Sequence, residues 1–391
     1  MLVGYSFNNF CSFDTDSEFS MEAGVGKVKG RFPDNYVALE SEYDLLKTAV
    51  IVGENAGGKS NFINSLKFFR GLFNANALVQ TVSVYVNASA QMRESNPVQK
   101  FNMSFASSNG QIYFYAIEID SFGIVTEKLS KQSKRKQALS VVFNIIRNEE
   151  GVYEAKQGKG KDIVNILKNS NNSNGLFVSK LSLLGNQDAK ATVDWFLKKL
   201  SPGAIATDEK EDAMKREDDL KVLRDPRYVE IFRMVDYSIC DIEVDDVKPY
   251  SKSIIIRRDS AGNSFKQELS QDSAGVREFF AWAVQIFRIV YEDKIVFADE
   301  MDRVLNPILS DRVIAFINGM EHKGQFVFST HNVLHLNLKT YMKEQIYFIT
   351  KSKDELTSEL YSLSDFPEVR YETTKIYEFY MKGILGGTSF E

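Results

Sequence analysis

Hydrophobic and polar residues alternate at the period of β-strands in the first third of the chain. Residues 1–7 predict an edge strand, and residues 101–105 and 112–117 predict two strands joined through an Asn-Gly dipeptide, which is typical of hairpins. Residues 122–129 continue the pattern as a third strand. This part of the chain therefore predicts a lobe that carries an antiparallel sheet.

A glycine-rich run, Gly53–Ser60, follows the apolar residues 49–52 and precedes a helical apolar period that begins at Phe62. The run has the full G-x-x-x-x-G-K-S spacing, which places backbone N–H groups around phosphate oxygens at the positive end of the following helix. In this motif Lys59 reaches the β- and γ-phosphates, and the hydroxyl of Ser60 ligates Mg²⁺. The residues expected to bind the nucleotide are Gly53, Asn55, Ala56, Gly57, Gly58, Lys59, Ser60 and Asn61.

The pattern becomes helical and polar between about residues 131 and 250. The segment 208–219 is almost wholly charged, which fits an exposed helix or a disordered loop. We expect a mainly helical insert here. A basic run at its start fits either a solvated face or a contact with nucleic acid or a partner; its residues are Lys128, Lys131, Lys134, Arg135 and Lys136.

Two later strands end in residues suited to nucleotide chemistry. A predicted buried strand at 294–298 has four apolar residues, 295–298, directly before Asp299 and Glu300. Next to the strand before the glycine-rich loop, Asp299 would reach the Mg²⁺, and Glu300 would polarise the water that attacks the γ-phosphate. Residues 325–330 end at His331, which can hydrogen-bond the γ-phosphate. The other two histidines have no such setting and are expected to be structural.

Residues 269–277 lie just before another amphipathic helix. Ser273 is a good N-cap for that helix, and the small residues after it, including Gly275, leave its positive end open to an anion. Taken alone, this segment fits a capped helix without further function as well as it fits an anion site.

Composition indicates in which class of protein and in which compartment this site would work. The chain has 391 residues with a net charge of −5, which gives no general attraction to nucleic acid. We find no apolar run of about 20 residues and no signal peptide, and Cys11 and Cys240 suggest neither a disulfide framework nor a zinc site. A cytoplasmic protein without a membrane partner is expected.

Phosphate loop, capped helix, Asp-Glu strand and strand-terminal histidine together resemble the ATP-binding-cassette (ABC) ATPase head over the whole chain. Residues 9–13 (Asn-Phe-Cys-Ser-Phe) and the loop at 53–61 are similar to the SMC-like branch. The resemblance is closer to stand-alone ATPases of bacterial anti-phage systems, of the RloA and AbiLi type and the ATPase subunits of PARIS-like and OLD-like systems. Residues 45–47, 329–332 and 380–387 are similar to these ATPases. It implies an α/β P-loop NTPase fold with a mixed sheet, an antiparallel sub-sheet and an inserted helical domain. The implied domains are lobe I (1–130), the insert (131–250) and lobe II (251–391).

The resemblance also implies that two chains pair head-to-tail, or form a higher oligomer, around ATP and Mg²⁺. Ser273, Gly275 and Arg277 of one chain would then close over the γ-phosphate held by the other. The remaining implied roles are catalysis by Glu300 and His331, metal binding by Ser60 and Asp299, and a loop joining the two sites at Asp302.

Three positions depart from the family pattern. Val276 stands where threonine is frequent, and Asn306 stands where a histidine commonly precedes Pro307. No glutamine is clearly placed to contact the metal, and Gln132 and Glu127 are the candidates. These departures bear more on the rate of hydrolysis than on ATP binding.

The function expected from the resemblance is that of an ATPase that senses infection and controls a separate effector, such as a nuclease of the Toprim or RloB kind. No acidic cluster after His331 has Toprim spacing. The alternative is a RecF-like repair ATPase that binds duplex DNA directly; a transporter head and a non-hydrolysing scaffold are further alternatives.

Overall fold

The structure is a computed structural model of the chain. It describes residues 1–391 except 41–42, 76, 95, 133–138, 160, 162–174, 204–216, 304, 353–354, 373–374 and 386–391. The strands are β1 (Leu2–Asn8), β2 (Ser17–Ser20), β3 (Tyr36–Ala38), β4 (Asp44–Leu46), β5 (Thr48–Val52), β6 (Gln99–Ala106), β7 (Ile112–Asp120), β8 (Gly123–Gln132), β9 (Ser140–Arg147), β10 (Tyr153–Gly158), β11 (Leu200–Pro202), β12 (Ile239–Glu243), β13 (Ile254–Arg258), β14 (Ser264–Glu268), β15 (Ile295–Ala298), β16 (Gln325–Thr330), β17 (Ile346–Lys351) and β18 (Ser358–Ser362). The α-helices are α1 (Lys59–Gly71), α2 (Ala88–Arg93), α4 (Phe177–Leu183), α5 (Gln187–Asp194), α7 (Glu217–Leu223), α8 (Pro226–Phe232), α9 (Pro249–Lys252), α10 (Ala274–Glu292), α11 (Pro307–Gly319) and α12 (Ile376–Met381).

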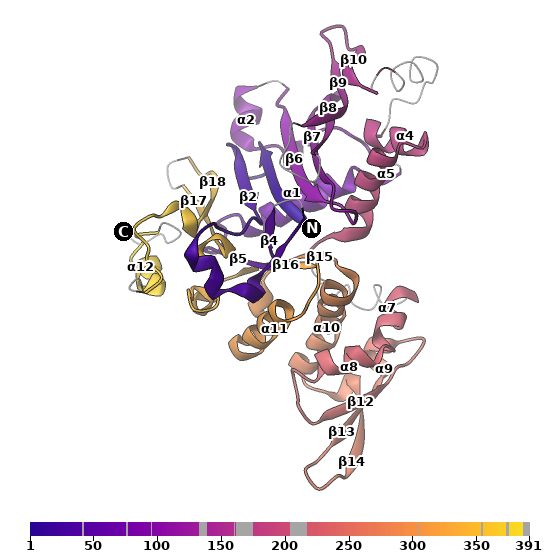
Figure 1. Ribbon diagram of the computed structural model, residues 1–391, viewed down its shortest axis with the longest axis vertical. Helices are drawn as coiled ribbons and strands as arrows, with labels where there is room; N and C mark the ends of the chain where they lie inside the picture. The colour runs from indigo at the N-terminus through magenta and orange to yellow at the C-terminus, as the bar shows by residue number, and fades with distance from the viewer. Residues whose placement is uncertain are drawn as a thin grey trace.

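A mostly parallel sheet forms the centre of the molecule, in the order β11-β15-β16-β5-β17-β18 (Figure 1). Strands β11, β15, β16, β5 and β17 pair in parallel, and β18 is antiparallel to β17. All five residues of β5 are buried, as expected of a strand covered on both faces. The strand before the glycine-rich loop therefore lies between strands from the last quarter of the chain.

A second, antiparallel sheet has the order β10-β9-β8-β7-β6-β1-β2 within the described residues. The predicted hairpin is confirmed as β6 and β7, whose register pairs Phe105 with Tyr113. The prediction of an edge strand at residues 1–7 is wrong, because β1 pairs with both β6 and β2. Its alternating pattern reflects one buried face rather than an open edge.

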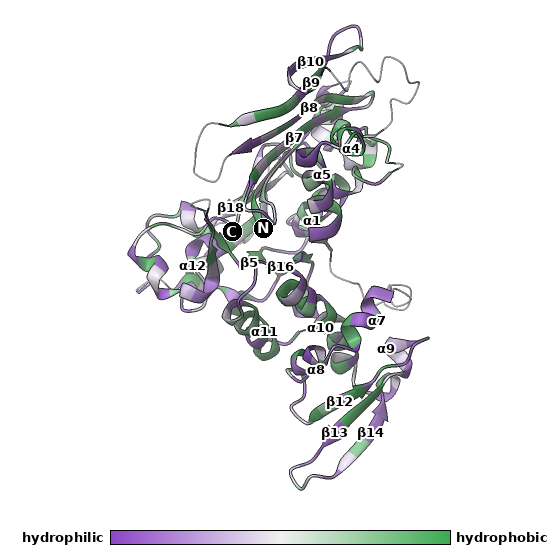
Figure 2. Ribbon diagram, turned by 45° about the vertical axis from the view of Figure 1, so that its right-hand side comes forward, coloured by the Kyte–Doolittle hydropathy of each residue, from purple (hydrophilic) through white to green (hydrophobic). Residues whose placement is uncertain are grey.

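Helix α1 fills the space between the two sheets, and helices α10 and α11 cover the other face of the parallel sheet. Phe62 and Phe69 of α1 belong to the same buried cluster as Ile51 of β5, whereas Val50 of β5 belongs to the cluster of α10 and α11. Successive residues of β5 thus face opposite layers. Figure 2 shows hydrophobic residues along α10 and the strands of the antiparallel sheet.

The segment expected to be a mainly helical insert is mixed in the structure. Besides α4, α5, α7 and α8, it contributes β9 and β10 to the antiparallel sheet, β11 to the parallel sheet and β12 to a third sheet. The third sheet, β12-β13-β14, lies at the opposite end of the molecule from β10 (Figure 1). In β9, the buried residues Phe143 and Ile145 are two positions apart and so lie on one face of the strand.

Several sequence predictions fall outside the described residues. They are most of the charged segment 208–219 and the basic residues Lys134, Arg135 and Lys136. No helix among the described residues has the length and apolar character needed to cross a membrane.

Candidate functional site

The parallel sheet brings the predicted site residues together at the carboxyl ends of three adjacent strands. The glycine-rich loop follows β5, Asp299 and Glu300 follow β15, and His331 follows β16, and these strands lie in the order β15-β16-β5. This edge is where ligands bind in open α/β sheets. A cavity of about 140 Å³ at this edge is lined by Glu54, Asn55, Ala56, Gly57, Gly58, Lys59, Ser60, Asn61, Glu300 and His331.

Two glycines of the loop are required by their surroundings. A Cβ at Gly53 would lie 2.2 Å from the carbonyl oxygen of Ile349, so no side chain fits there. Gly58 has a φ of +123°, and a Cβ there would lie 2.4 Å from Oγ of Ser358. The loop is thus packed against β17 and β18, and its backbone N–H groups are left to form the phosphate cradle.

The ammonium group of Lys59 is held across the loop by three contacts. Its Nζ donates to the carbonyl oxygens of Gly53 at 2.8 Å and Glu54 at 2.9 Å, and it lies 3.3 Å from Nδ1 of His331. Burial lowers the pKa of Lys59 below its usual value, and nearby carboxylates, Asp299 first among them, oppose this. Because an ammonium group only donates hydrogen bonds, Nδ1 of His331 is the acceptor in its contact with the ammonium group of Lys59.

Glu300 stands in a strained backbone conformation at the end of β15. Its φ is +48°, which is uncommon for a residue with a side chain and is typical of functional sites. Its backbone N–H donates to Oγ of Ser329 at 2.8 Å, and this hydroxyl in turn donates to the carboxylate of Asp299 at 2.5 Å. Arg303 donates to the Glu300 carboxylate at 3.0 Å. Glu300 lines the cavity, as expected of a residue that acts on an attacking water.

Asp302 is connected to His331 within the same chain. It lies in the short 3₁₀ helix η7 (Met301–Arg303), and its Oδ1 accepts a hydrogen bond from the backbone N–H of His331 at 3.2 Å. Asn306, the departure from the family pattern, caps helix α11 by accepting from the N–H of Leu309 at 3.0 Å. An asparagine therefore meets a local capping requirement at this position.

The proposed trans residues lie elsewhere on the surface. Ser273 is the N-cap of α10 and accepts from the N–H of Val276 at 3.4 Å, as predicted. Ser273, Gly275 and Arg277 are exposed, and none of the three lines the cavity of the same chain. A Cβ at Gly275 would meet no atom within 4 Å, so space is open in front of this helix end.

Neither candidate for the metal-contacting residue lines the cavity. The carboxylate of Glu127 is buried and accepts from the N–H groups of Phe177 at 2.8 Å and Val178 at 2.7 Å, so it anchors the start of α4. Burial raises its pKa to about 7. Gln132 is buried and accepts from the hydroxyl of Tyr43 at 3.2 Å. These contacts assign both residues structural roles.

The remaining histidines are buried, and one described residue of the basic run forms an ion pair. Both His322 and His335 are buried, and Nε2 of His322 lies 2.7 Å from the carbonyl oxygen of Ile317. Lys131 of the basic run pairs with Asp188 at 2.8 Å, whereas Lys128 is exposed.

Three serines support the loop and the carboxylates in ways that sequence reasoning missed. Oγ of Ser358 donates to the carbonyl oxygen of Gly57 at 2.6 Å and lies 2.7 Å from Oγ of Ser12, and Asn61 donates to Oγ of Ser12 at 2.9 Å. The third is Ser329, described above. Ser12 lies in a segment singled out for its family resemblance, but no sequence signal indicates the contact with Ser358.

The donor set fits a Mg²⁺ ion. Ser60 is an exposed hydroxyl in the first turn of α1, and Asp299 is a carboxylate oriented by Ser329, so both offer the oxygen ligands that this ion prefers. When bound, Mg²⁺ would neutralise charge that develops on the phosphate oxygens.

The chain belongs to a family of P-loop ATPases. Residues 49–337 match the family described as "AAA domain, putative AbiEii toxin, Type IV TA system". This range contains the glycine-rich loop, both carboxylates and His331. Comparison of the sequence with curated proteins gave no match.

Solved structures of SMC heads are similar to this chain at low identity. The SMC head domain from Thermotoga maritima has a TM-score of 0.45 and 13% identity, covering 92% of this chain and 98% of that one. A second, an Smc head bound to the C-terminal winged-helix domain of ScpA, has a TM-score of 0.44 and 14% identity, covering 92% and 97%. The Pyrococcus furiosus Smc head with an extended coiled coil, bound to the C-terminal domain of ScpA, has a TM-score of 0.43 and 12% identity, covering 92% and 96%. At these scores, the chemistry assigned to this chain rests on its own residues.

Proposed function

We propose that this chain hydrolyses ATP within a head-to-tail pair of copies, and that the ATP-bound pair controls a separate effector in bacterial anti-phage defence. The observation that supports a dimer is the small size of the cavity. The cavity at Gly53–Ser60 measures about 140 Å³, well below the roughly 300–1,000 Å³ of pockets that enclose a drug-sized ligand. It therefore suits a phosphate tail, and the rest of the nucleotide stays open to a second surface.

The exposed start of α10 is a surface of the right chemistry to complete the site. A helix N-terminus with an exposed serine and glycine offers N–H groups and a positive dipole end to an anion. In a head-to-tail pair, Ser273 and Gly275 of one copy would face the γ-phosphate held by the loop of the other. Each composite site would then combine the phosphate loop of one copy with the α10 end of the other.

The residues of the site divide the chemistry of hydrolysis among them. The loop N–H groups and Lys59 hold the phosphates, and Ser60 and Asp299 hold the metal. Glu300 orients and polarises the attacking water, and His331, whose Nδ1 accepts from Lys59, can donate a hydrogen bond from Nε2 to the γ-phosphate. Loss of the γ-phosphate would remove the contact with the partner copy and release the pair.

The oligomeric state tests the dimer. Light scattering on the Glu300→Gln variant, which should bind ATP without turning it over, is expected to report a dimer with ATP and Mg²⁺ and a monomer with ADP. Ser273→Arg in the same background places a bulky cation at the helix end and should abolish the ATP-dependent dimer. A dimer that forms equally with ADP, or that tolerates Ser273→Arg, would contradict the proposal.

The role in defence is supported by the family description, which refers to a toxin system, and by the resemblance of the motifs to anti-phage ATPases. Co-purification of the chain with the product of the adjacent gene, with and without ATP, tests whether an effector is held. Tight binding of the isolated chain to plain duplex DNA, falling steeply with salt, would instead favour the RecF-like alternative.

A further inference from the structure

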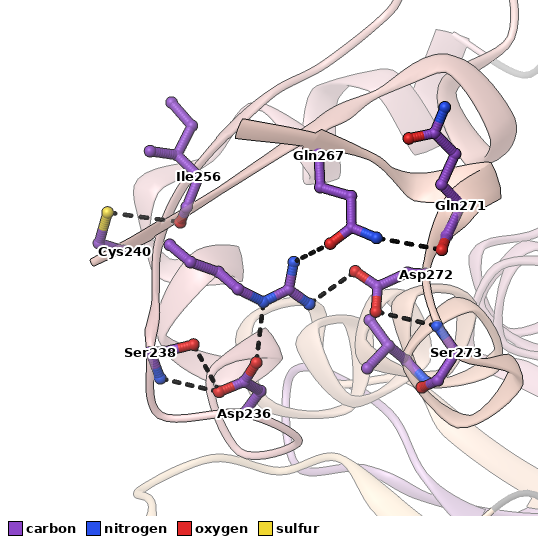
Figure 3. A network of polar contacts seen from close by, with 10 residues as sticks. Asp236, Ser238, Cys240, Ile256, Gln267, Gln271, Asp272 and Ser273 are labelled. Atoms are coloured by element: carbon purple, nitrogen blue, oxygen red, sulfur yellow. Dashed lines mark hydrogen bonds and ion pairs between the residues drawn. The ribbon is translucent and has the colours of Figure 1, made fainter. Parts of the chain in front are cut away.

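A buried arginine connects the third sheet to the residues just before helix α10. Arg257, on β13, has a side chain that is 8% exposed. Its Nη2 donates to the carboxylate of Asp272 at 2.6 Å, and its Nε donates to Asp236 at 2.9 Å (Figure 3). Asp272 is only 9% exposed and directly precedes the N-cap Ser273. An ion pair this well shielded from water holds its geometry more firmly than an exposed pair.

A second side chain of the same sheet binds the segment that precedes Ser273. Gln267, on β14, donates from Nε2 to the carbonyl oxygen of Gln271 at 3.0 Å, and its Oε1 accepts from Nη1 of Arg257 at 3.4 Å. Figure 3 shows dashed lines from one guanidinium group to Gln267, Asp272 and Asp236, with Ser273 next to Asp272. Residues 271–272 are therefore fastened to two neighbouring strands at once.

These contacts extend to the N-cap residue through a backbone hydrogen bond. The second carboxylate oxygen of Asp272 accepts from the N–H of Ser273 at 2.9 Å. One carboxylate oxygen of Asp272 is thus held by Arg257. The other oxygen holds the backbone N–H of Ser273 and so orients the residue whose hydroxyl is the N-cap. Without the cation, Asp272 would keep a buried negative charge and would be expected to turn toward water.

From these contacts we infer that Arg257 is a positioning residue for the proposed trans site: it sets the direction of the Ser273 end of α10 toward the partner copy. The inference rests on the proposed function, because it assigns to Arg257 the orientation of a surface that acts on another chain. The β13–β14 hairpin projects at the end of the molecule in Figure 1. Through Arg257, the position of this hairpin would be transmitted to the Ser273 end of α10.

Mixing two inactive variants tests the inference. Arg257→Met should keep nucleotide binding at its own loop but lose most of its turnover. Lys59→Met should lose nucleotide binding but keep its own α10 end intact. In a mixture, half of the randomly formed dimers contain one intact composite site, so roughly a quarter of the wild-type rate should return. Recovery by mixing is a readout that mere destabilisation of the Arg257 variant would not give.

Controls separate failure of this inference from failure of the dimer. Ser273→Arg mixed with Lys59→Met should recover activity in the same way. If that pair does not recover, the trans arrangement itself fails. If it recovers while Arg257→Met has wild-type kcat, or cannot be complemented, the role of Arg257 is overturned. Arg258→Met is the matched control, because Arg258 is the next residue on the strand, is exposed, and should keep full activity.

A conservative variant covers the case in which Arg257→Met does not fold. Arg257→Lys keeps the charge but replaces a planar group that contacts two carboxylates with a single ammonium. We expect it to show a native circular dichroism spectrum, unchanged binding of nucleotide and a kcat between those of wild type and Arg257→Met. Wild-type kcat in a folded Arg257→Lys, together with wild-type kcat in a folded Asp272→Asn, would contradict the inference.

Discussion

The hydroxyl of Ser329 donates a hydrogen bond to the carboxylate of Asp299 over 2.5 Å. The same oxygen accepts from the N–H of Glu300, so one buried side chain of β16 orients both acidic residues at the end of β15. The proposed metal ligand and the proposed catalytic carboxylate thereby share one hydrogen-bonding partner.

Replacing Ser329 with alanine should slow ATP turnover without unfolding the protein. The change leaves a buried N–H and a carboxylate oxygen without their partner, at a cost of about 1–3 kcal/mol. We expect kcat to fall roughly tenfold, since small misplacements of catalytic groups are costly. Steady-state ATPase assays check this. Ser179→Ala is the matched control, because the buried hydroxyl of Ser179 has no hydrogen-bond partner among the described residues, and it should leave kcat unchanged.

Glu300→Gln should separate binding from turnover. The amide keeps the size of the side chain but cannot accept a proton from water, so kcat is expected to fall about 10²–10⁴-fold. The affinity for ATP should change little, because Lys59 and the loop backbone hold the phosphates. Calorimetry and ATPase assays measure the two quantities. Glu321→Gln, at an exposed carboxylate, should behave as wild type; equal rates in both variants would exclude Glu300 as the catalytic carboxylate.

Gly58→Ala should disrupt the phosphate loop. The residue has a φ of +123°, and its added Cβ would meet Oγ and Cβ of Ser358. We expect a loss of ATP affinity of at least about tenfold, which corresponds to 1.4 kcal/mol. Gly71→Ala is a control on the same helix, because nothing lies within 4 Å of its Cβ and alanine favours helices. Unchanged ATP binding in Gly58→Ala would show that the loop relaxes freely.

The buried Glu127 should make stability depend on pH. Burial raises its folded-state pKa from 4.5 to about 7, so the folded state holds a proton that the unfolded state has released over this range. The stabilisation is therefore complete below pH 4.5 and is lost as pH rises toward 7, by up to about 3 kcal/mol.

Thermal midpoints of wild type and Glu127→Gln between pH 4.5 and 8 test this sign. Gln can still accept from an N–H of α4 but does not titrate. The midpoint of wild type relative to the variant should fall as pH rises and level off above 7. A difference that rises with pH would mean that the hydrogen bonds from Phe177, Val178 and Tyr115 keep the carboxylate charged.

The site could be predicted from the sequence where the chemistry lies in contiguous residues. The loop spacing and the strand-terminal Asp299, Glu300 and His331 are local patterns, and the parallel order β15-β16-β5 brings them together. The supports could not be predicted, because Ser12 and Ser358 meet across 346 positions and carry no spacing rule. The strands β9 and β10 were missed because partial exposure weakens their alternation.

The interleaving of β5 between β16 and β17 has a consequence for synthesis on the ribosome. The loop at Gly53–Ser60 is translated before the residues that pack against it, Ile349 and Ser358, and Ser358 follows Gly57 by 301 positions. A nascent chain in which β17 and β18 have not yet emerged contains the complete motif without the residues that pack against it. Competence to bind ATP should therefore appear only after β17 and β18 have been translated.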